Sequence, residues 1–201
     1  MPRKVRYNLA ASLDGFIATP TGSYSWIVDD KTIDFNNLYA QFGCFIMGRT
    51  THEAYLAMDP VENPLRAYYK TGSVVVVGDT LDRDLETQVE VVKLGEVESF
   101  VRALKGRDGE TDGDIWLMGG GKLAGEMLRL GLVDTVEVAV MPVLLGEGVK
   151  MFEGKGREDG WRLELRGCER KETGILMLEY DVLYGGALEM MTRSEFRGVS
   201  F

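Results

Sequence analysis

The feature of this sequence that most constrains its fold is the alternation of short apolar runs with amphipathic segments. Each run is rich in Val and Ile and is bounded by turn residues, a pattern typical of buried strands. The runs occupy residues 5–11, 44–48, 74–78, 89–92, 115–118 and 136–141. A chain of 201 residues with 45% hydrophobic content is long enough to bury such strands in one domain.

Helical periodicity fills several of the gaps between these runs. Two segments place apolar residues at the i, i+3, i+4 and i+7 spacing of one helix face, namely Phe35, Leu38, Tyr39 and Phe42 in the first and Val97, Phe100, Val101 and Leu104 in the second. A third helix is predicted over 122–130, and Gly131 suits the left-handed position just past its end. Strands that alternate with helices predict an α/β fold with a mainly parallel central sheet.

In the last part of the chain, apolar residues instead recur at every second position, as they do in a strand with one buried face. Residues 161–168 and 175–183 alternate apolar and polar side chains, and the polar stretch 169–174 joins them. This pattern predicts an antiparallel hairpin at the sheet edge. We expect one domain over residues 1–201, with a core at about 4–183 and a tail at 184–201 that is either a frayed end or a cover for a neighbouring subunit.

Charge and composition narrow the classes of partner. The net charge of −9 disfavours nucleic acid and anionic membrane surfaces. No apolar run approaches the roughly 18 residues of a membrane span, and the N-terminus MPRKVRYNLA lacks the apolar core of a secretory signal. We therefore expect a cytoplasmic protein with a small-molecule ligand, in which Cys44 and Cys168 are buried reduced thiols. With His52 as the one histidine, no metal site is expected.

Two strand ends carry glycine turns suited to phosphate. The sequence GRTT at 48–51 and the sequence MGGGK at 118–122 each follow a predicted strand and open a predicted helix. Backbone N–H groups at a helix N-terminus can approach an anion closely, and Arg49 adds a guanidinium. Loops from separate strand ends converge in an open α/β sheet, so the two turns together indicate a nucleotide site. Each turn alone also fits a simple helix cap or a tight strand-to-helix turn.

The order of motifs carries a family resemblance. The Rossmann fingerprint G-x-G-x-x-G after the first strand and the P-loop are both absent. Instead, the chain resembles the dihydrofolate reductase-like superfamily in the order of four motifs. These motifs are SLDGFIA, MGRTTHEAY, VVVVGDT and IWLMGGGKLAGEMLRLGLVDTVEVAVMPVLLGEG. Over residues 4–183 the chain is most similar to the riboflavin-biosynthesis reductase (RibD C-terminal) domain family. The resemblance implies a three-layer fold with helices on both faces of the sheet, NADPH as reductant, and a homodimer.

The resemblance also implies roles for particular residues. The cofactor-binding set is Ala11, Gly48, Arg49, Thr50, Thr51, Gly78, Asp79, Met118, Gly119, Gly120, Gly121, Lys122 and Leu123. The substrate-side set is Ser12, Leu13, Tyr39, Leu144 and Gly146. Asp14 matches the start of the loop beside the nicotinamide, and Trp26 matches the loop aromatic before the first helix. Such loops would shield the hydride from water.

Two positions depart from the family pattern. The family often has Leu-Arg-Ala-x-Ala-Asp-Ala at 38–44, where this chain has Tyr39 in place of the Arg and Gly43 in place of the Asp. Loss of the Arg weakens the case for a sugar-phosphate substrate. Asp79, at the end of the adenine-side strand, would repel a 2′-phosphate and favour NADH, whereas Arg49 favours NADPH. NADPH is the expected cofactor and NADH the alternative.

The acid that protonates or orients the substrate is expected to be Asp34. It flanks the apolar face of the first predicted helix, where dihydrofolate reductases place the carboxylate that grips the pterin. Asp29 and Asp30 are competitors, and all three also fit helix capping or a solvated surface. Asp14 can act in catalysis or orient the loop backbone, and His52 is expected to be structural or on the surface.

These features predict an NAD(P)H-dependent reductase that acts on a C=N or C=O bond of a small heterocyclic or imine-like substrate. Two alternatives lie in the same class, namely reduction of a ribosylamino-pyrimidine phosphate in riboflavin biosynthesis and reduction of dihydrofolate. An alternative of another class is a nucleotide-binding scaffold that kept the fold and lost catalysis.

Overall fold

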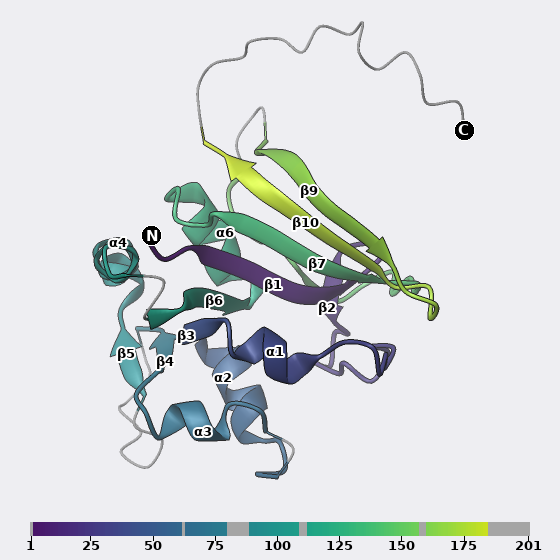
Figure 1. Ribbon diagram of the computed structural model, residues 1–201, viewed down its shortest axis with the longest axis horizontal. Coiled ribbons are helices and arrows are strands. Elements are labelled where there is room, and N and C mark those ends of the chain that lie inside the picture. Colours follow the sequence, from purple (N-terminus) through teal and green to yellow (C-terminus); the bar gives the residue numbers. More distant parts are fainter. Residues whose placement is uncertain (1, 62, 80–88, 109–111, 157–159, 185–201) are drawn as a thin grey trace, which may run out of the picture.

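The computed structural model describes residues 2–61, 63–79, 89–108, 112–156 and 160–184. Its centre is an eight-stranded sheet of order β5-β4-β3-β6-β1-β7-β10-β9 (Figure 1). The strands from β5 to β7 pair in parallel, and β10 and β9 continue the sheet in antiparallel pairing. The strands of this sheet are β1 (Val5–Ser12), β3 (Phe42–Gly48), β4 (Val74–Val77), β5 (Glu90–Val92), β6 (Asp114–Gly119), β7 (Thr135–Met141), β9 (Arg162–Arg170) and β10 (Leu176–Leu183).

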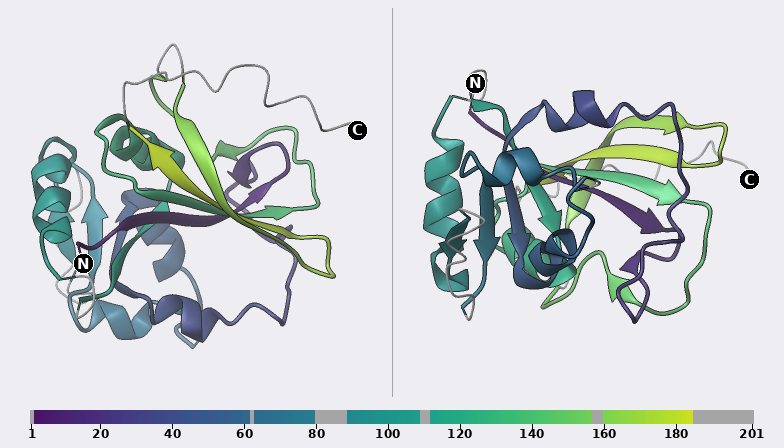
Figure 2. Two further views of the ribbon diagram at one scale, coloured as in Figure 1. Left: turned by 45° about the horizontal axis from the view of Figure 1, so that its top comes forward. Right: turned by 90° about the horizontal axis from the view of Figure 1, so that it is seen from below.

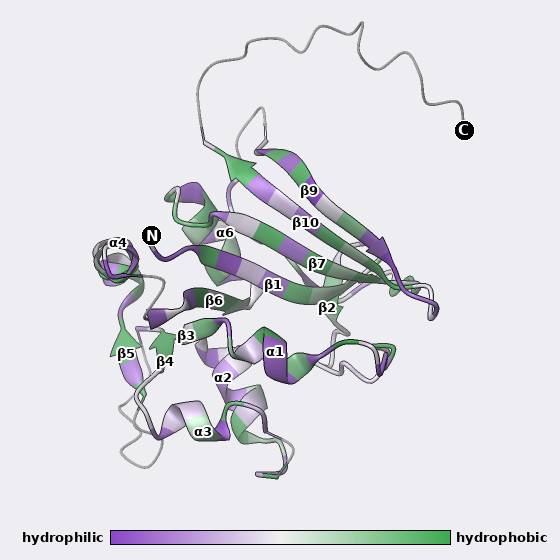
Figure 3. Ribbon diagram, viewed as in Figure 1, coloured by the Kyte–Doolittle hydropathy of each residue, from purple (hydrophilic) through white to green (hydrophobic). Residues whose placement is uncertain are grey.

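Helices cover both faces of the sheet, because the central strands are apolar on both sides. The short η1 turn (Leu94–Glu96), α4 (Val97–Lys105) and α6 (Gly121–Arg129) belong to one face, where they pack on Tyr7, Ile46 and Leu117. On the other face, α1 (Phe35–Tyr39), α2 (Arg49–Leu56) and α3 (Arg66–Tyr69) surround the second core. Figure 3 shows the continuous apolar β4 and the alternating β10. The predicted three-layer α/β fold with its C-terminal hairpin is confirmed.

A small second sheet lies beside the end of β1. It pairs β2 (Phe16–Ala18) with β8 (Val149–Lys150) (Figure 2). The segment after β8 packs on α6, and the Tyr7 hydroxyl donates to the Met151 carbonyl at 2.6 Å. Both strands are too short to produce a hydrophobic period in the sequence, and neither was predicted.

Several element boundaries differ from the prediction. Phe42 opens β3 instead of closing the first helix, since α1 ends at Tyr39 after little more than one turn. The periodicity of this segment arose because Phe42 packs in the same aromatic cluster as Tyr39. The four-residue helix α3 was not predicted, and its length explains why. Gly131 has φ of +69°, as expected past the end of α6.

The two cysteines differ from each other. Cys44 is buried in β3 as predicted, and burial raises its pKa to about 11. Cys168 is exposed, so the prediction that both thiols are buried is wrong. It lies on β9, the edge strand of the sheet, whose residues are almost all exposed.

No helix among the described residues is long and apolar enough to cross a membrane. Thr80, at the end of the adenine-side motif, and residues 185–201 of the expected tail lie outside the described residues.

Gly125 tests the packing of α6 on the segment after β8. A Cβ at this position would overlap the carbonyl oxygen of Glu153. Gly125→Ala should therefore destabilise the fold by about 1–3 kcal/mol, although Gly to Ala in an open helix stabilises by about 1 kcal/mol. Urea unfolding measures this change. Gly95→Ala is the control, because no atom lies within 4 Å of its Cβ position, and a stabilised Gly125→Ala protein would contradict the packing.

Candidate active site

The two glycine turns lie side by side at the centre of the sheet. Gly48 ends β3 and is the N-cap of α2, while Gly120 follows β6 and is the N-cap of α6. A Cβ on Gly48 would lie 3.8 Å from the Gly120 nitrogen, and a Cβ on Gly120 would lie 3.7 Å from Oγ1 of Thr51. The predicted convergence of the two turns is confirmed. Two helix N-termini therefore present N–H groups to one place, which favours an anion.

The second turn also has a packing role. Gly119 has a φ of +107°, a backbone conformation that residues with a Cβ rarely adopt. Its peptide bond to Gly120 is cis. A Cβ on Gly121 would overlap the carbonyl oxygen of Lys150. Glycine at 121 thus lets the segment after β8 approach the first turn of α6, where the Glu153 N–H donates to the Gly121 carbonyl at 3.0 Å.

Arg49 lies between the first turn and the end of β4. Its side chain is about half exposed, at 51%, and its Nε lies 3.7 Å from Oε1 of Glu53 one turn along α2. A Cβ on Gly78 would lie 3.8 Å from the Cβ of Arg49. The Cβ of Arg49 therefore lies beside Gly78 at the end of β4, and the predicted role of its guanidinium in binding phosphate stays a prediction.

A cleft of about 190 Å³ opens on this side of the glycine turns. It is lined by Val77, Gly78, Asp79, Leu94, Lys122 and Leu123, so it joins the end of β4 to the first turn of α6. Asp79 accepts a hydrogen bond from the Leu94 N–H at its Oδ1, at 3.1 Å. Val77 and Leu94 were not singled out from the sequence, because a lone apolar residue at a strand end carries no chemical signal.

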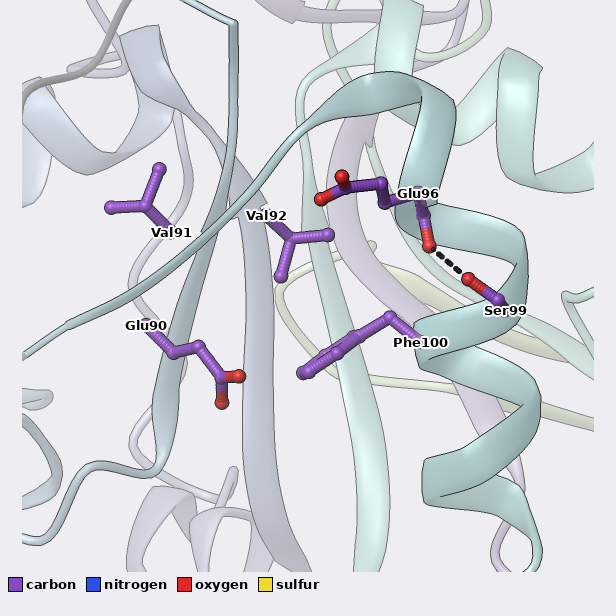
Figure 4. A pocket seen from close by; sticks show the side chains of 6 residues that line it. All are labelled: Glu90, Val91, Val92, Glu96, Ser99 and Phe100. Carbon is purple, nitrogen blue, oxygen red and sulfur yellow. Dashed lines mark hydrogen bonds between the residues drawn. The ribbon is translucent and has the colours of Figure 1, made fainter.

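A larger cavity of about 490 Å³ lies at the β5 edge (Figure 4). Its lining residues are Glu90, Val91, Val92, Glu96, Ser99 and Phe100. Two of these six lining residues carry carboxylates and none of the six is basic, which disfavours phosphate. None of the predicted site residues lines this cavity.

Asp14 anchors the loop after β1. Its carboxylate accepts hydrogen bonds from Oγ of Ser12 at 2.6 Å and from the N–H groups of Leu145 and Gly146. The bond from the Ser12 hydroxyl, together with that from the Gly146 N–H, lowers the pKa of Asp14 to about 2. Asp14 thus holds the loop after β1 against the backbone of Leu145 and Gly146, and its part in catalysis stays a prediction.

The hydrogen bonds of Asp14 join the loop after β1 to the loop after β7. Each of these loops carries one exposed residue that was predicted to lie on the substrate side. Leu13 is 65% exposed, and its N–H donates to the Val143 carbonyl at 2.9 Å. Leu144 is 70% exposed. Their contact with substrate stays a prediction. Ala11 and Ser12, by contrast, are buried at the end of β1.

A second carboxylate anchors the loop before α1. Asp30 is buried and accepts from the N–H and hydroxyl of Thr32 and from the hydroxyl of Thr173, the last at 2.6 Å. These hydrogen bonds lower the pKa of Asp30 to about 2, and the bond from the Thr173 hydroxyl has the largest effect. Thr173 sits in the turn between β9 and β10, so Asp30 ties the loop to the hairpin. No signal in the sequence marked Thr173 for this role.

Asp34 and Trp26 lie on the same long connection. Asp34 is the N-cap of α1 and accepts from the Asn37 N–H at 3.0 Å, with its side chain exposed. Trp26 is half-buried, and its Nε1 donates to the Ser23 carbonyl at 3.2 Å. The structure thus gives both residues local roles, and their part in catalysis stays a prediction.

Tyr39 packs in an aromatic cluster. Its ring centroid lies 4.8 Å from that of Trp116 and 5.8 Å from that of Phe45. Burial raises its pKa to about 12, while a hydrogen bond with Tyr55 opposes part of that rise. The position where the family often has Arg is therefore filled by a partly buried ring that packs against the second core, and the contact of Tyr39 with substrate stays a prediction.

His52 is buried in α2, with Nδ1 3.2 Å from the hydroxyl of Tyr69. This agrees with the expected structural role. Among the described residues, no group of three or more His, Cys, Asp or Glu side chains is placed to hold a metal ion.

Comparisons with known proteins agree with this architecture. The family model for the RibD C-terminal domain matches residues 3–177. The chain is 29% identical to the uncharacterized protein YwjB of Bacillus subtilis over 168 residues, which are 82% of this chain and 91% of that protein. It is 30% identical over 169 residues to the riboflavin biosynthesis protein RibD of Mycobacterium tuberculosis, covering 76% of this chain but only 46% of RibD.

Solved structures show the same fold. RibD of Acinetobacter baumannii superposes with a TM-score of 0.65 at 20% identity, covering 90% of this chain and 58% of that one. Dihydrofolate reductase of Enterococcus faecalis, solved with NADP(H), gives a TM-score of 0.56 at 15% identity, covering 89% of this chain and 94% of that one. The fold is that of the dihydrofolate reductase-like class. The chain belongs to the RibD C-terminal domain family, which supports an oxidoreductase.

The ionisation of Asp14 tests its role as an anchor. Because its hydrogen bonds favour the charged form, its carboxyl should titrate near pH 2 in the folded protein, below the ordinary value of 3.8. The stabilising effect of the folded carboxylate is complete above the unfolded pKa and is lost as the pH falls through the folded one. Carbon-13 NMR of the carboxyl group measures this directly. A pKa at or above 3.8 would contradict the anchored loop.

Proposed function

We propose that this chain is an NAD(P)H-dependent reductase that transfers hydride to a C=N or C=O bond of a small heterocyclic or imine-like molecule. The observation that carries the proposal is the meeting of two glycine turns at the N-termini of α2 and α6, with Arg49 and Thr51 beside them. The residues fit a dinucleotide, because Gly48 and Gly120 keep the shared surface free of side chains and leave N–H groups for the pyrophosphate.

The strand order gives the dinucleotide a direction. The pyrophosphate would lie over the ends of β3 and β6, at the middle of the sheet. The adenosine half then belongs on the β4 side, in the cleft that contains Asp79 and Leu94. The nicotinamide half belongs on the β1 side, where Ala11 ends the strand and the Asp14-anchored loop begins.

A reduced nicotinamide supplies the hydride in this reaction. The chain itself must hold the acceptor, exclude water and place a proton. Leu13 and Leu144 are the exposed apolar side chains of the two anchored loops and would cover the acceptor. Asp34, at the start of α1, is the proposed orienting group or proton source for the acceptor.

The substrate we propose lacks a sugar phosphate. Tyr39 stands at the position where the family often has an Arg and packs, partly buried, against the second core, so a ring replaces the guanidinium that would pair with phosphate. The riboflavin-pathway acceptor remains the second candidate, since the family match favours it. Spectrophotometric turnover of NADPH with that acceptor, with dihydrofolate and with simple cyclic imines separates these possibilities.

A homodimer in the cytoplasm belongs to the same proposal. Leu163 and Leu165 project from one face of the edge strand β9 and are 43% and 55% exposed. An apolar face of this kind on an edge strand is typical of a contact between subunits.

Arg49 should carry the affinity for the 2′-phosphate. Arg49→Ala should raise the Kd for NADPH about tenfold to a hundredfold, since a charge-assisted hydrogen bond is lost, and should leave the Kd for NADH nearly unchanged. Titration followed by nicotinamide fluorescence measures both. Arg162→Ala, on the edge strand β9, is the matched control for lost positive charge. An unchanged NADPH affinity in Arg49→Ala would reject this phosphate site.

Asp34→Asn separates capping from catalysis. Asn is as good an N-cap as Asp, so α1 and the melting temperature should be preserved. Loss of the acid should slow hydride transfer about a hundredfold or more, without a change in the Kd for NADPH. Single-turnover absorbance with an active acceptor measures the rate. Full activity in Asp34→Asn together with a loss in Asp29→Asn would assign the role to Asp29.

A further inference from the structure

Asp79 stands where the adenosine ribose of the proposed cofactor would lie. It follows β4 directly and lines the cleft of about 190 Å³ together with Leu94 and Lys122. Its carboxylate is held in place there, because Oδ1 accepts the Leu94 N–H at 3.1 Å. The preceding residue, Gly78, has its Cβ position 3.8 Å from the Cβ of Arg49.

The cleft therefore contains charges of both signs. Lys122 lines it from the first turn of α6. Arg49 is not one of the lining residues, but its Cβ lies 3.8 Å from the Cβ position of Gly78, which is one of them. Asp79 is the one carboxylate among the six lining residues. A purely basic cleft would favour the extra phosphate of NADPH, so the carboxylate at its rim works against the two cations.

The two dinucleotides differ only at the 2′ position of the adenosine ribose. A carboxylate can accept a hydrogen bond from the 2′-hydroxyl of NADH, as acidic residues do in other dinucleotide sites. The same carboxylate repels a 2′-phosphate, and the repulsion is strongest when neither charge can move away. The hydrogen bond from Leu94 restrains Asp79 in this way.

We propose that Asp79 sets the cofactor preference of this chain by weakening NADPH and supporting NADH, so that both dinucleotides are used. This inference rests on the proposed function, because it takes the cleft as the adenosine site. Arg49 attracts the 2′-phosphate and Asp79 repels it, and the measured preference is the balance of the two.

The test is the ratio of the two dissociation constants, Kd for NADH over Kd for NADPH, in Asp79→Asn. Asn removes the charge and keeps an oxygen that can accept the Leu94 N–H, so the local fold is retained. The ratio should rise about tenfold or more, through tighter NADPH binding and weaker NADH binding. Fluorescence titration at fixed low ionic strength measures both constants, since salt screens the effect.

Glu164→Gln on β9 is the matched control, because it makes the same change in net charge on an exposed strand at the opposite edge of the sheet. Repeating the two titrations with ADP and 2′-phospho-ADP in place of NADH and NADPH limits the measurement to the adenosine half of the dinucleotide. An unchanged ratio in Asp79→Asn, or an equal change in Glu164→Gln, would overturn the role of Asp79 while the proposed function stands. Failure of the unmodified protein to bind either dinucleotide would overturn both.

Discussion

The parallel pairing of β3 with β6 decides where the candidate site lies. Parallel strands end at the same edge of a sheet, so the glycine turns that follow them are brought together with the helices they open. A shift in register after Ile46 sets Met47 opposite Gly119, which aligns the two turns. Without this pairing, GRTT and MGGGK would be two separate helix starts. The phosphate-binding role that we propose for them depends on both turns lying together.

Two carboxylates, those of Asp14 and Asp30, hold loops in place through hydrogen bonds. Asp14 and Asp30 are both candidate acids in the sequence. In the structure each accepts hydrogen bonds from a neighbour two residues away and from a distant part of the chain, Asp14 from the Gly146 N–H and Asp30 from the Thr173 hydroxyl. Those bonds fix the loops that frame the β1 side of the site. They also hold both groups ionised, because each donor stabilises the charged form.

Much of the fold could be predicted from local patterns. The buried strands, α4 and α6 followed from apolar periods that are long enough to be unambiguous. Phe42 was misplaced because an aromatic residue on either element can reach the same cluster. Cys168 was misjudged because the alternation of β9 says which residues share a face, but not whether anything covers that face. The pairing of β2 with β8 joins segments more than a hundred residues apart and leaves no period in either.

The sequence by itself determined the class of fold, the family, and the two glycine turns, because strand and helix periods and glycine spacing are local properties of the chain. Only the tertiary structure decided what each polar residue touches. It placed Tyr39 against Trp116 in the aromatic cluster, Asp14 against Gly146, and Asp79 with Lys122 in the lining of one cleft. Those roles depend on contacts between residues far apart in the chain, and a side chain's chemistry follows from its neighbours in space.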